Sequence, residues 1–278
     1  MAEMSRWTRR EALKAGLAGA AMLSASGVAM ADSRTYGPFR VGLQSYSLRA
    51  FDLATALDMT RALALRYWEA TQTHVPLTSD PAAIRRVLAA FSAHNVALTD
   101  WGVQAFDGDP DQARRVFQFA HAMGIRHLSA DPAPAAFPVL EKLCAEYRIL
   151  IGIHNHGPGA RYATIAQLEA ALHGTHPGIG VCLDTGHLLR SGEDPVEAVR
   201  KFGSRIHGVH LKDVKDRRTF TIVGQGDLDV VGLFRELHRQ RYRGLIALEY
   251  EEKPEAPGPD INLCLQATQD AIEKAVRR

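Results

Sequence analysis

The residues best suited to chemistry lie where two apolar runs of the chain give way to polar side chains. The segment 180–187 reads GVCLDTGH, and the segment 205–213 reads RIHGVHLKD. Apolar runs of this length, bounded by polar residues, are typical of buried parallel strands. Parallel α/β enzymes place their chemistry at the carboxyl ends of such strands, where Asp184 and His210 stand. Because Asp and His are good ligands for first-row metals, we predict that these two residues bind a divalent cation.

Two further runs carry candidate ligands at their ends. The run RILIGIHN (148–155) carries His154 and is followed by His156, and the run LIALEY (245–250) carries Glu249. Neighbouring strands lie about 4.8 Å apart, so side chains at their ends can meet around one ion. A buried His alone is more often a hydrogen-bonded core residue than a ligand. The coincidence of Asp, His and Glu at the same ends of successive runs nevertheless predicts a metal site.

Eight extended runs and the helices between them must position these residues. The predicted strands cover residues 40–47, 68–73, 96–101, 125–130, 148–155, 179–184, 206–211 and 245–250. The predicted helices lie at 53–65, from 80, at 109–124, at 135–147, from 164, from 194, at 229–241 and at 261–276. Asp-Pro pairs start three of these helices, and Thr164 with Gln167 predicts a capping box for another.

The alternation of strands and helices indicates the fold class. It argues for parallel pairing with right-handed crossovers, and eight units in this length argue for a closed (β/α)8 TIM barrel. An open doubly wound sheet is the alternative. It is disfavoured because no Gly-rich phosphate-binding fingerprint follows the first strand.

The first 31 residues have the features of an export signal. Arg9-Arg10 precedes a mild apolar run at 15–28, and Ala29-Met30-Ala31 is a small-x-small cleavage site. This order is typical of a twin-arginine (Tat) signal and not of a transmembrane helix. We therefore predict a Tat-type signal peptide over residues 1–31, a barrel domain over 32–278, and a periplasmic protein exported by the Tat machinery.

Charge and cysteine content exclude some classes of function. The chain has 33 basic and 31 acidic side chains, of which four basic and two acidic ones precede residue 32, so 29 of each remain. A net charge of zero gives no reason to expect nucleic acid as a partner, and it disfavours a DNA-repair nuclease. The three cysteines, Cys144, Cys182 and Cys264, lie in apolar surroundings and are predicted to be buried core residues.

Four short elements carry a resemblance to a known family. They are LDTGH (183–187), HLKD (210–213), GQGDLD (224–229) and ALEYE (247–251). In this order they resemble the sugar phosphate isomerase/epimerase family, which has a xylose isomerase-like TIM barrel. The resemblance implies one divalent metal ion, Mn²⁺ before Mg²⁺, Co²⁺ or Zn²⁺. It also implies that Asp184, His210 and Glu249 bind the metal, that His187 contacts the substrate, and that Glu249 takes part in catalysis.

The fourth ligand position departs from that family. The family commonly has Glu-Asn-His on its fifth strand, whereas this chain has His154-Asn155-His156. We expect His154 to replace the Glu as a metal ligand, because imidazole is a competent ligand for the same ions. His156 is then free to act beside the substrate as a catalytic acid or base. Since both residues lie on one strand face, the sequence leaves open which of them is the ligand.

Several other residues are weaker candidates for substrate binding. Lys212 could bind a substrate oxygen or lie at the rim, and Glu69 could face the mouth or form a salt bridge. Trp101 could stack on a sugar, although core packing is the usual position for Trp on a strand. Gln44 and Tyr46 share a strand face and could line a sugar pocket.

These features predict an exported, metal-dependent isomerase or epimerase that acts on a sugar or keto-sugar by proton abstraction next to a carbonyl. The alternative on the same site is a 3-keto-glycoside lyase or hydrolase, because one of the family's two metal-binding Glu residues is missing. A third hypothesis is a non-catalytic periplasmic sugar-binding barrel. The expected partners are a small-molecule sugar or keto-glycoside and the Tat machinery, and the sequence leaves a homo-oligomer open.

Overall fold

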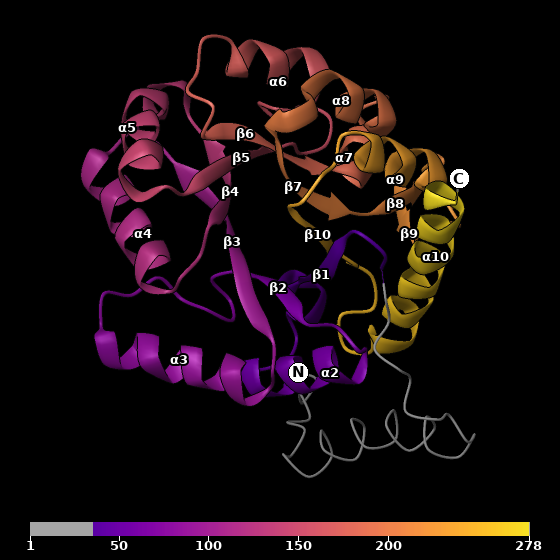
Figure 1. Ribbon diagram of the computed structural model, residues 1–278, viewed down its shortest axis with the longest axis horizontal. Helices are drawn as coiled ribbons and strands as arrows, with labels where there is room; N and C mark the ends of the chain where they lie inside the picture. Colours follow the sequence, from indigo (N-terminus) through magenta and orange to yellow (C-terminus); the bar gives the residue numbers. More distant parts are fainter. Residues whose placement is uncertain (1–35, 278) are drawn as a thin grey trace, which may run out of the picture. The chain divides into compact units, whose positions relative to one another are not determined.

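The computed structural model describes residues 36–277, which form a closed barrel of eight parallel strands (Figure 1). The strands are β1 (Arg40–Gln44), β2 (Tyr67–Ala70), β3 (Ala97–Phe106), β4 (His127–Pro132), β5 (Leu150–His154), β6 (Ile179–Asp184), β7 (Ile206–Leu211) and β10 (Leu245–Leu248). Their order around the barrel is β1-β10-β7-β6-β5-β4-β3-β2, and every neighbouring pair is parallel. The predicted (β/α)8 barrel is therefore confirmed.

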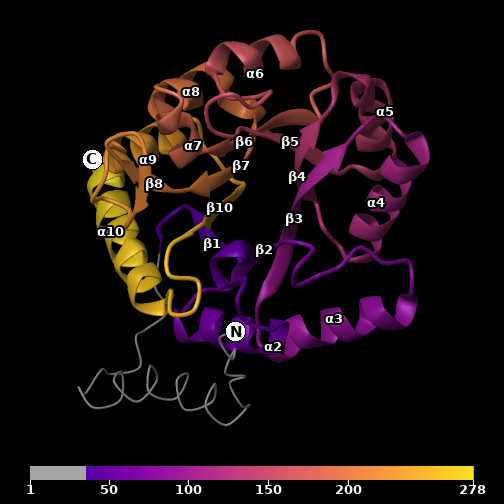
Figure 2. The same ribbon diagram turned by 180° about the vertical axis from the view of Figure 1, so that it is seen from behind.

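Helices surround the barrel on its outside (Figures 1 and 2). They are α2 (Leu53–Ala62), α3 (Pro81–Ala93), α4 (Pro110–Ala122), α5 (Phe137–Tyr147), α6 (Ile165–Leu172), α7 (Thr185–Arg190), α8 (Pro195–Phe202), α9 (Val230–Arg239) and α10 (Gly258–Val276). Short 3-10 turns lie at η1 (Ser45–Leu48), η2 (Pro134–Ala136) and η3 (Gly203–Arg205). The sequence predicted one helix after the sixth strand, but the structure has two there, because the six-residue α7 starts directly after Asp184.

The structure contains side-chain caps at the predicted helix starts. The Asp80 carboxylate accepts hydrogen bonds from the backbone N–H groups of Ala82 and Ala83 at the start of α3. Thr164 and Gln167 form the predicted capping box at the start of α6. Such caps satisfy N–H groups that have no partner within the helix.

Polar side chains fill the barrel lumen, and glycines on the neighbouring strands leave space for them. A Cβ atom at Gly152 would lie 2.4 Å from Nε2 of His127, and one at Gly208 would lie 2.6 Å from its Cε1. His127 therefore occupies space that these two glycines leave free. Since side chains two residues apart point to the same side of a strand, His154 and His210 extend from β5 and β7 toward the mouth above it.

Apolar side chains fill the space between the strands and the helices. The largest fully buried ones include Trp68, Trp101, Phe106, Phe117 and Phe234. The three cysteines are also buried and free, as predicted, and burial raises the pKa of each thiol to about 12.

A small hairpin extends from the mouth after β7. It consists of β8 (Asp213–Lys215) and the antiparallel β9 (Thr219–Thr221). The Asp213 carboxylate accepts backbone hydrogen bonds of 2.8–3.0 Å from Val214, Gly224, Gly226 and Leu228. The Asp of HLKD and the glycines of GQGDLD thus hold this loop in place, which is a structural reason for two of the four short elements.

The predicted signal peptide lies outside the described residues, so its boundary at residue 31 stays a prediction. Within residues 36–277 no helix is both long enough and apolar enough to span a membrane.

Candidate metal centre

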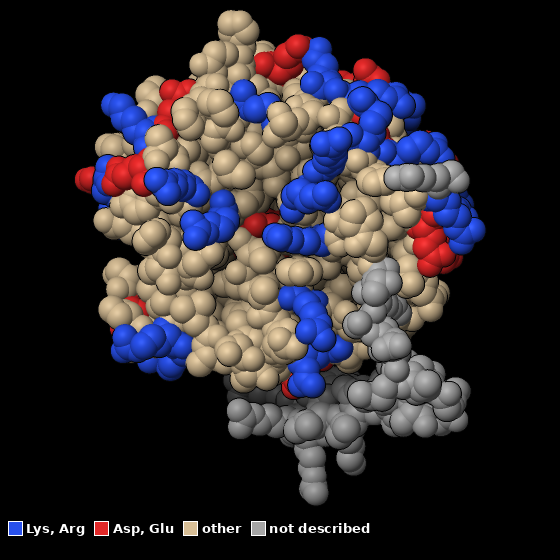
Figure 3. Space-filling model, in the orientation of Figure 1, with Lys and Arg blue, Asp and Glu red and all other residues tan. Residues whose placement is uncertain are grey.

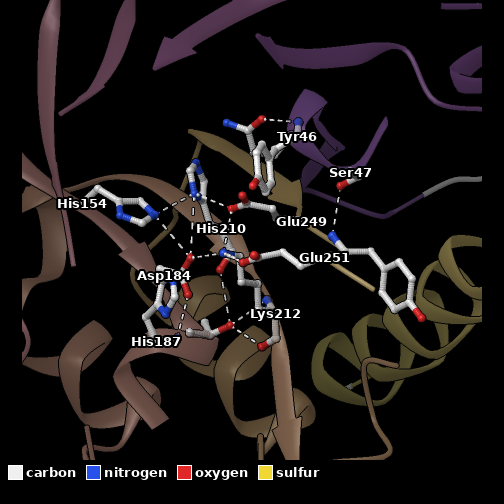
Figure 4. Close-up of polar contacts among 12 residues, drawn as sticks. Tyr46, Ser47, His154, Asp184, His187, His210, Lys212, Glu249 and Glu251 are labelled. Carbon is white, nitrogen blue, oxygen red and sulfur yellow. Dashed lines mark hydrogen bonds and ion pairs between the residues drawn. The ribbon is translucent and has the colours of Figure 1, made fainter. Parts of the chain in front are cut away.

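Four predicted ligands converge at the carboxyl ends of neighbouring strands (Figure 4). Each of His154, Asp184, His210 and Glu249 offers one ligand atom, and these atoms all lie within 4.8 Å of one another. Nε2 of His154 is 3.0 Å from Nδ1 of His210 and 3.3 Å from Oδ2 of Asp184. Nδ1 of His210 is 3.0 Å from Oε2 of Glu249. The structure thus brings the four residues together, while their binding of a metal stays a prediction.

The strand register explains this convergence. His154 pairs with Cys182 across β5 and β6, and Asp184 pairs with His210 across β6 and β7. His210 also pairs with Ala247 on β10, two residues before Glu249. Each ligand therefore comes from the last residues of its strand or from the residue just beyond.

The donor atoms fit a first-row divalent ion. Two imidazole nitrogens and two carboxylate oxygens suit such ions better than an all-oxygen set does. Oδ2 of Asp184 and Oε2 of Glu249 are buried and accept no well-oriented hydrogen bond. Their nearest partners are Nζ of Lys212 and ring nitrogens of His154 and His210, so a cation can bind these two oxygens in place of those contacts.

Lys212 supplies a positive charge beside the same oxygens. Its Nζ lies 3.0 Å from Oδ2 of Asp184 and 3.1 Å from Oε2 of Glu249, and it also donates to Glu251. Lys212 is buried, so it does not lie loosely at the rim. It contacts the carboxylates of Asp184 and Glu249 directly, and its predicted contact with a substrate oxygen stays a prediction.

The charges of the cluster follow from burial and these contacts. Burial alone would raise the pKa of Glu249, but Lys212 and His210 outweigh it and bring that pKa to about 2. Burial likewise opposes ionisation of Asp184, yet Lys212 and His187 hold its pKa well below the usual value. Burial lowers the pKa of His154 to about 4. Burial alone would lower the pKa of His210, but Cys182 and Glu69 hold it well above its usual value. Near pH 7 the site therefore offers two ionised carboxylates and a neutral His154 in metal-binding form, and a metal would displace a proton from His210.

Glu69 does not lie where a substrate-binding residue would, and the structure corrects that prediction. Oε2 of Glu69 is 2.8 Å from Nε2 of His210, and Ser129 donates to the other carboxylate oxygen. Only 1% of Glu69 is exposed. It lies on the side of His210 away from the ligand cluster, so it positions that imidazole instead of contacting substrate.

Trp101 is also corrected, because it lies in the core. Its ring is fully buried, its Nε1 donates to the carbonyl of Val75 at 2.9 Å, and it packs edge-on against Phe119 of α4. The neighbouring Asp100 is buried beside His127 in the lumen. Since successive side chains alternate across a strand, Trp101 points outward and cannot stack on a sugar at the mouth.

His156 and His187 form the side of the mouth next to His154. The His156 ring lies 4.5 Å from the His154 ring and 5.6 Å from the His187 ring, measured between centroids. His156 is only half-buried and is not part of the four-residue cluster. The structure therefore brings His154, and not His156, to the ligand position. The backbone N–H of His187 donates to Oδ1 of Asp184.

Two further groups at the mouth escaped the sequence reasoning. Glu251 lies two residues after Glu249, and this spacing could have indicated that both carboxylates reach Lys212. Arg190 at the end of α7 lies 3.2 Å from Nδ1 of His187. No signal in the sequence pointed to Arg190, because the short helix α7 was not predicted.

Several known proteins are similar to this chain in sequence or in fold. Inosose dehydratase of Clostridium tetani is 31% identical over 155 residues, which are 49% of this chain and 51% of the relative. The chain thus spans about half the length of this curated relative. The crystal structure of an uncharacterised protein from Parabacteroides distasonis ATCC 8503 is 28% identical and covers 84% of this chain and 99% of that one, with a TM-score of 0.67.

Another solved structure shares the fold at lower identity. The IolI protein with a bound zinc atom is 15% identical, covers 86% of this chain and 100% of that one, and has a TM-score of 0.70. The sequence model described as xylose isomerase-like TIM barrel matches residues 54–267, well over half of the chain. The chain therefore belongs to the xylose isomerase-like TIM barrel family.

Proposed function

We propose that this protein is a divalent-metal-dependent enzyme that removes a proton next to the carbonyl of a keto-sugar and expels a β-leaving group. The observation that carries this proposal is the make-up of the ligand cluster. Glu249 supplies one carboxylate from β10, but His154 stands where the family commonly has a second Glu. A proton shuttle between two opposed carboxylates is therefore absent from these positions. Single-base elimination, as in a 3-keto-glycoside lyase, needs only one proton acceptor.

The roles of the residues follow from their positions. A divalent ion, Mn²⁺ in the first instance, held by the four-residue cluster would act as a Lewis acid and acidify the C–H next to the carbonyl. His156 takes that proton, because its imidazole is half-buried at the mouth and lies outside the ligand cluster. The Lys212 ammonium, fixed by Asp184 and Glu249, stabilises negative charge on a substrate oxygen.

The relatives support elimination chemistry. Curated relatives that match this chain include inosose dehydratases, and loss of water is an elimination. The resemblance to the structures of a D-tagatose 3-epimerase-like protein and of L-ribulose 3-epimerase shows the fold alone, because their sequence identity is below 20%. The family's isomerase or epimerase activity remains the second candidate, since Glu249 and His156 come from different strands and could act as two separate bases.

Turnover in deuterated water separates these candidates. The purified protein, loaded with Mn²⁺, is incubated with keto-sugars and 3-keto-glycosides and followed by NMR, with a chelator-treated sample as the control. We expect a released leaving group and an unsaturated ketone. An intact epimer carrying deuterium would favour the isomerase candidate instead. Sugar binding without any turnover and without a stoichiometric ion would support a non-catalytic barrel and overturn the proposal.

We also propose that residues 1–31 direct export to the periplasm through the Tat machinery. The support is the order of Arg9-Arg10, the apolar run and the small-x-small site. Replacing both arginines with lysine should leave unprocessed precursor in the cytoplasm, as measured by fractionation and immunoblotting. Normal processing and export of that variant would contradict the Tat prediction.

A further inference from the structure

The guanidinium of Arg190 at the mouth has no carboxylate partner. Within residues 36–277 it makes one hydrogen bond, to Nδ1 of His187, and it forms no ion pair. Its central carbon lies 5.3 Å from the centre of the Phe220 ring on β9. A guanidinium has five N–H donors, so most of its donors here remain available. We propose that Arg190 binds an oxyanion of the substrate, which makes the substrate a keto-sugar acid or a keto-sugar phosphate rather than a neutral sugar.

The position of Arg190 allows one ligand to reach both this group and the metal centre. A Cβ atom at Gly157 would lie 3.3 Å from Nη1 of Arg190, so the guanidinium extends from α7 to the loop that follows β5. The His187 ring lies next to it, and its centroid is 6.0 Å from that of the ligand His154. A single imidazole thus separates Arg190 from the ligand cluster. A sugar with its carbonyl at the cluster can extend along His187 to the guanidinium.

The balance of charge at the mouth favours an anion once the ion is bound. Among the described residues, the charged groups there are the carboxylates of Asp184, Glu249 and Glu251, the ammonium of Lys212, and the guanidinium groups of Arg49 and Arg190. Three negative charges thus face three positive ones, and a divalent ion adds two positive charges that are not compensated. Figure 3 shows basic side chains around a central hollow in which acidic atoms lie.

Arg190 differs from the other guanidinium groups of these loops. Arg161, in the loop between β5 and α6, is paired with Asp131 at 3.3 Å. Arg49 donates to the backbone carbonyls of Tyr46 and Glu251 and lies over the Tyr46 ring. Among the described residues, Arg190 has neither an acidic partner nor a hydrogen bond to a backbone carbonyl. Because Arg recognises carboxylate and phosphate through paired N–H groups, Arg190 is the group best placed to bind a substrate oxyanion.

This inference rests on the proposed function, and a binding measurement tests it separately from turnover. Fructose, fructose 6-phosphate and 5-ketogluconate are titrated into the Mn²⁺-loaded protein by calorimetry at equal ionic strength. We expect at least one of the two anions to bind about tenfold more tightly than fructose, because charge-assisted hydrogen bonds are stronger than neutral ones. Tighter binding of 5-ketogluconate would assign a carboxylate, and tighter binding of fructose 6-phosphate would assign a phosphate.

Variants at two arginines complete the test. Arg190→Met should remove the preference for the anion, whereas the control Arg161→Met should retain it. Arg190→Lys keeps the charge without the planar fork and should retain part of the preference, which serves if Arg190→Met does not fold. Equal binding of all three probes, binding of none of them, or a preserved preference in Arg190→Met would overturn the inference. Metal-dependent turnover of a neutral keto-sugar without any anion preference would overturn this inference alone and leave the proposed function standing.

Discussion

The two imidazoles of the candidate metal centre, His154 and His210, are held in different ways. His210 on β7 donates from Nε2 to the buried carboxylate of Glu69, which Ser129 holds in turn. His154 on β5 has no hydrogen-bond partner for its Nδ1. Its ring is instead packed between those of His156 and His210, with centroids 4.5 and 4.7 Å away. On the side away from the ligand cluster, a chain of hydrogen bonds therefore orients His210, whereas ring packing and the contacts of Nε2 within the cluster orient His154.

This difference indicates which ligand the protein can exchange. A carboxylate partner fixes the tautomer and the orientation of a metal-binding His. His210 has such a partner in Glu69, which lies in the lumen beneath it. Replacing His210 therefore disturbs both the candidate metal site and the packing of the barrel lumen. His154 occupies a position where the resemblance seen in the sequence implies a Glu, and no described residue is bonded to its Nδ1 and would need to change with it. We infer that His210 on β7 is required for the site to form, whereas the residue at position 154 on β5 determines which reaction the site catalyses.

The largest effect is expected for His210→Ala. This change removes a candidate ligand and leaves Glu69 buried without its partner. Removing one partner of a buried ion pair typically lowers the free energy of unfolding by about 3–5 kcal/mol, and we expect a loss of that size. His154→Ala is the matched control, and it should cost less because Asp184 retains Lys212. Urea unfolding of the metal-free proteins measures both. Equal losses in the two variants would contradict the distinction between the two imidazoles.

Glu69→Gln tests the support of His210 without removing a ligand. The Gln side chain offers the imidazole N–H only a neutral acceptor in place of a charged carboxylate, so it orients His210 less firmly. We therefore expect metal affinity to fall about 10–100-fold. Calorimetric titration of the metal-free protein with Mn²⁺ gives the dissociation constant. An unchanged constant would show that Glu69 does not position His210.

His154→Glu tests whether β5 tunes the chemistry. The variant should still bind the ion, because carboxylate and imidazole both suit first-row metals. It places a third carboxylate in the cluster, which is the second Glu beside Glu249, so elimination should slow while deuterium exchange at the acidic carbon appears. NMR in deuterated water measures both rates. If the variant keeps its metal and its elimination rate while His156→Ala loses the metal, then His156 is the ligand and His154 is not.

The smallest effect concerns His207, at the other end of β7 from the metal centre. Its Nδ1 contacts the carbonyl of Ile151 at 2.9 Å, and burial lowers its pKa from 6.5 to about 4. Between these values the unfolded chain binds a proton that the folded chain does not, so stability falls as the pH drops from 6.5 toward 4. His207→Gln should therefore lose less stability than the wild type over this window, as measured by urea unfolding at several pH values. Parallel pH profiles would contradict this assignment.

Site residues could be predicted from the sequence where they lie at the carboxyl end of a strand. Asp184 and His210 follow apolar runs, and parallel strands bring such ends to one mouth, so their meeting could be predicted. Glu69 and Trp101 could not be placed in the same way. Alternation along a strand assigns a residue to one of two faces, but the bulge in the pairing of β2 with β3 shifts the register there. Arg190 depends on a helix of six residues, which is too short to leave a periodic pattern.

The central claim is that His154, Asp184, His210 and Glu249 bind one divalent ion. Equilibrium dialysis of the metal-free protein against Mn²⁺, with metal determined by mass spectrometry, tests it most directly when wild type and Asp184→Ala are compared. We predict about one bound ion per chain in the wild type and at least a 10–100-fold loss of affinity in the variant, because a charged ligand is removed. No saturable binding by the wild type, or a full equivalent retained by Asp184→Ala, would contradict the claim.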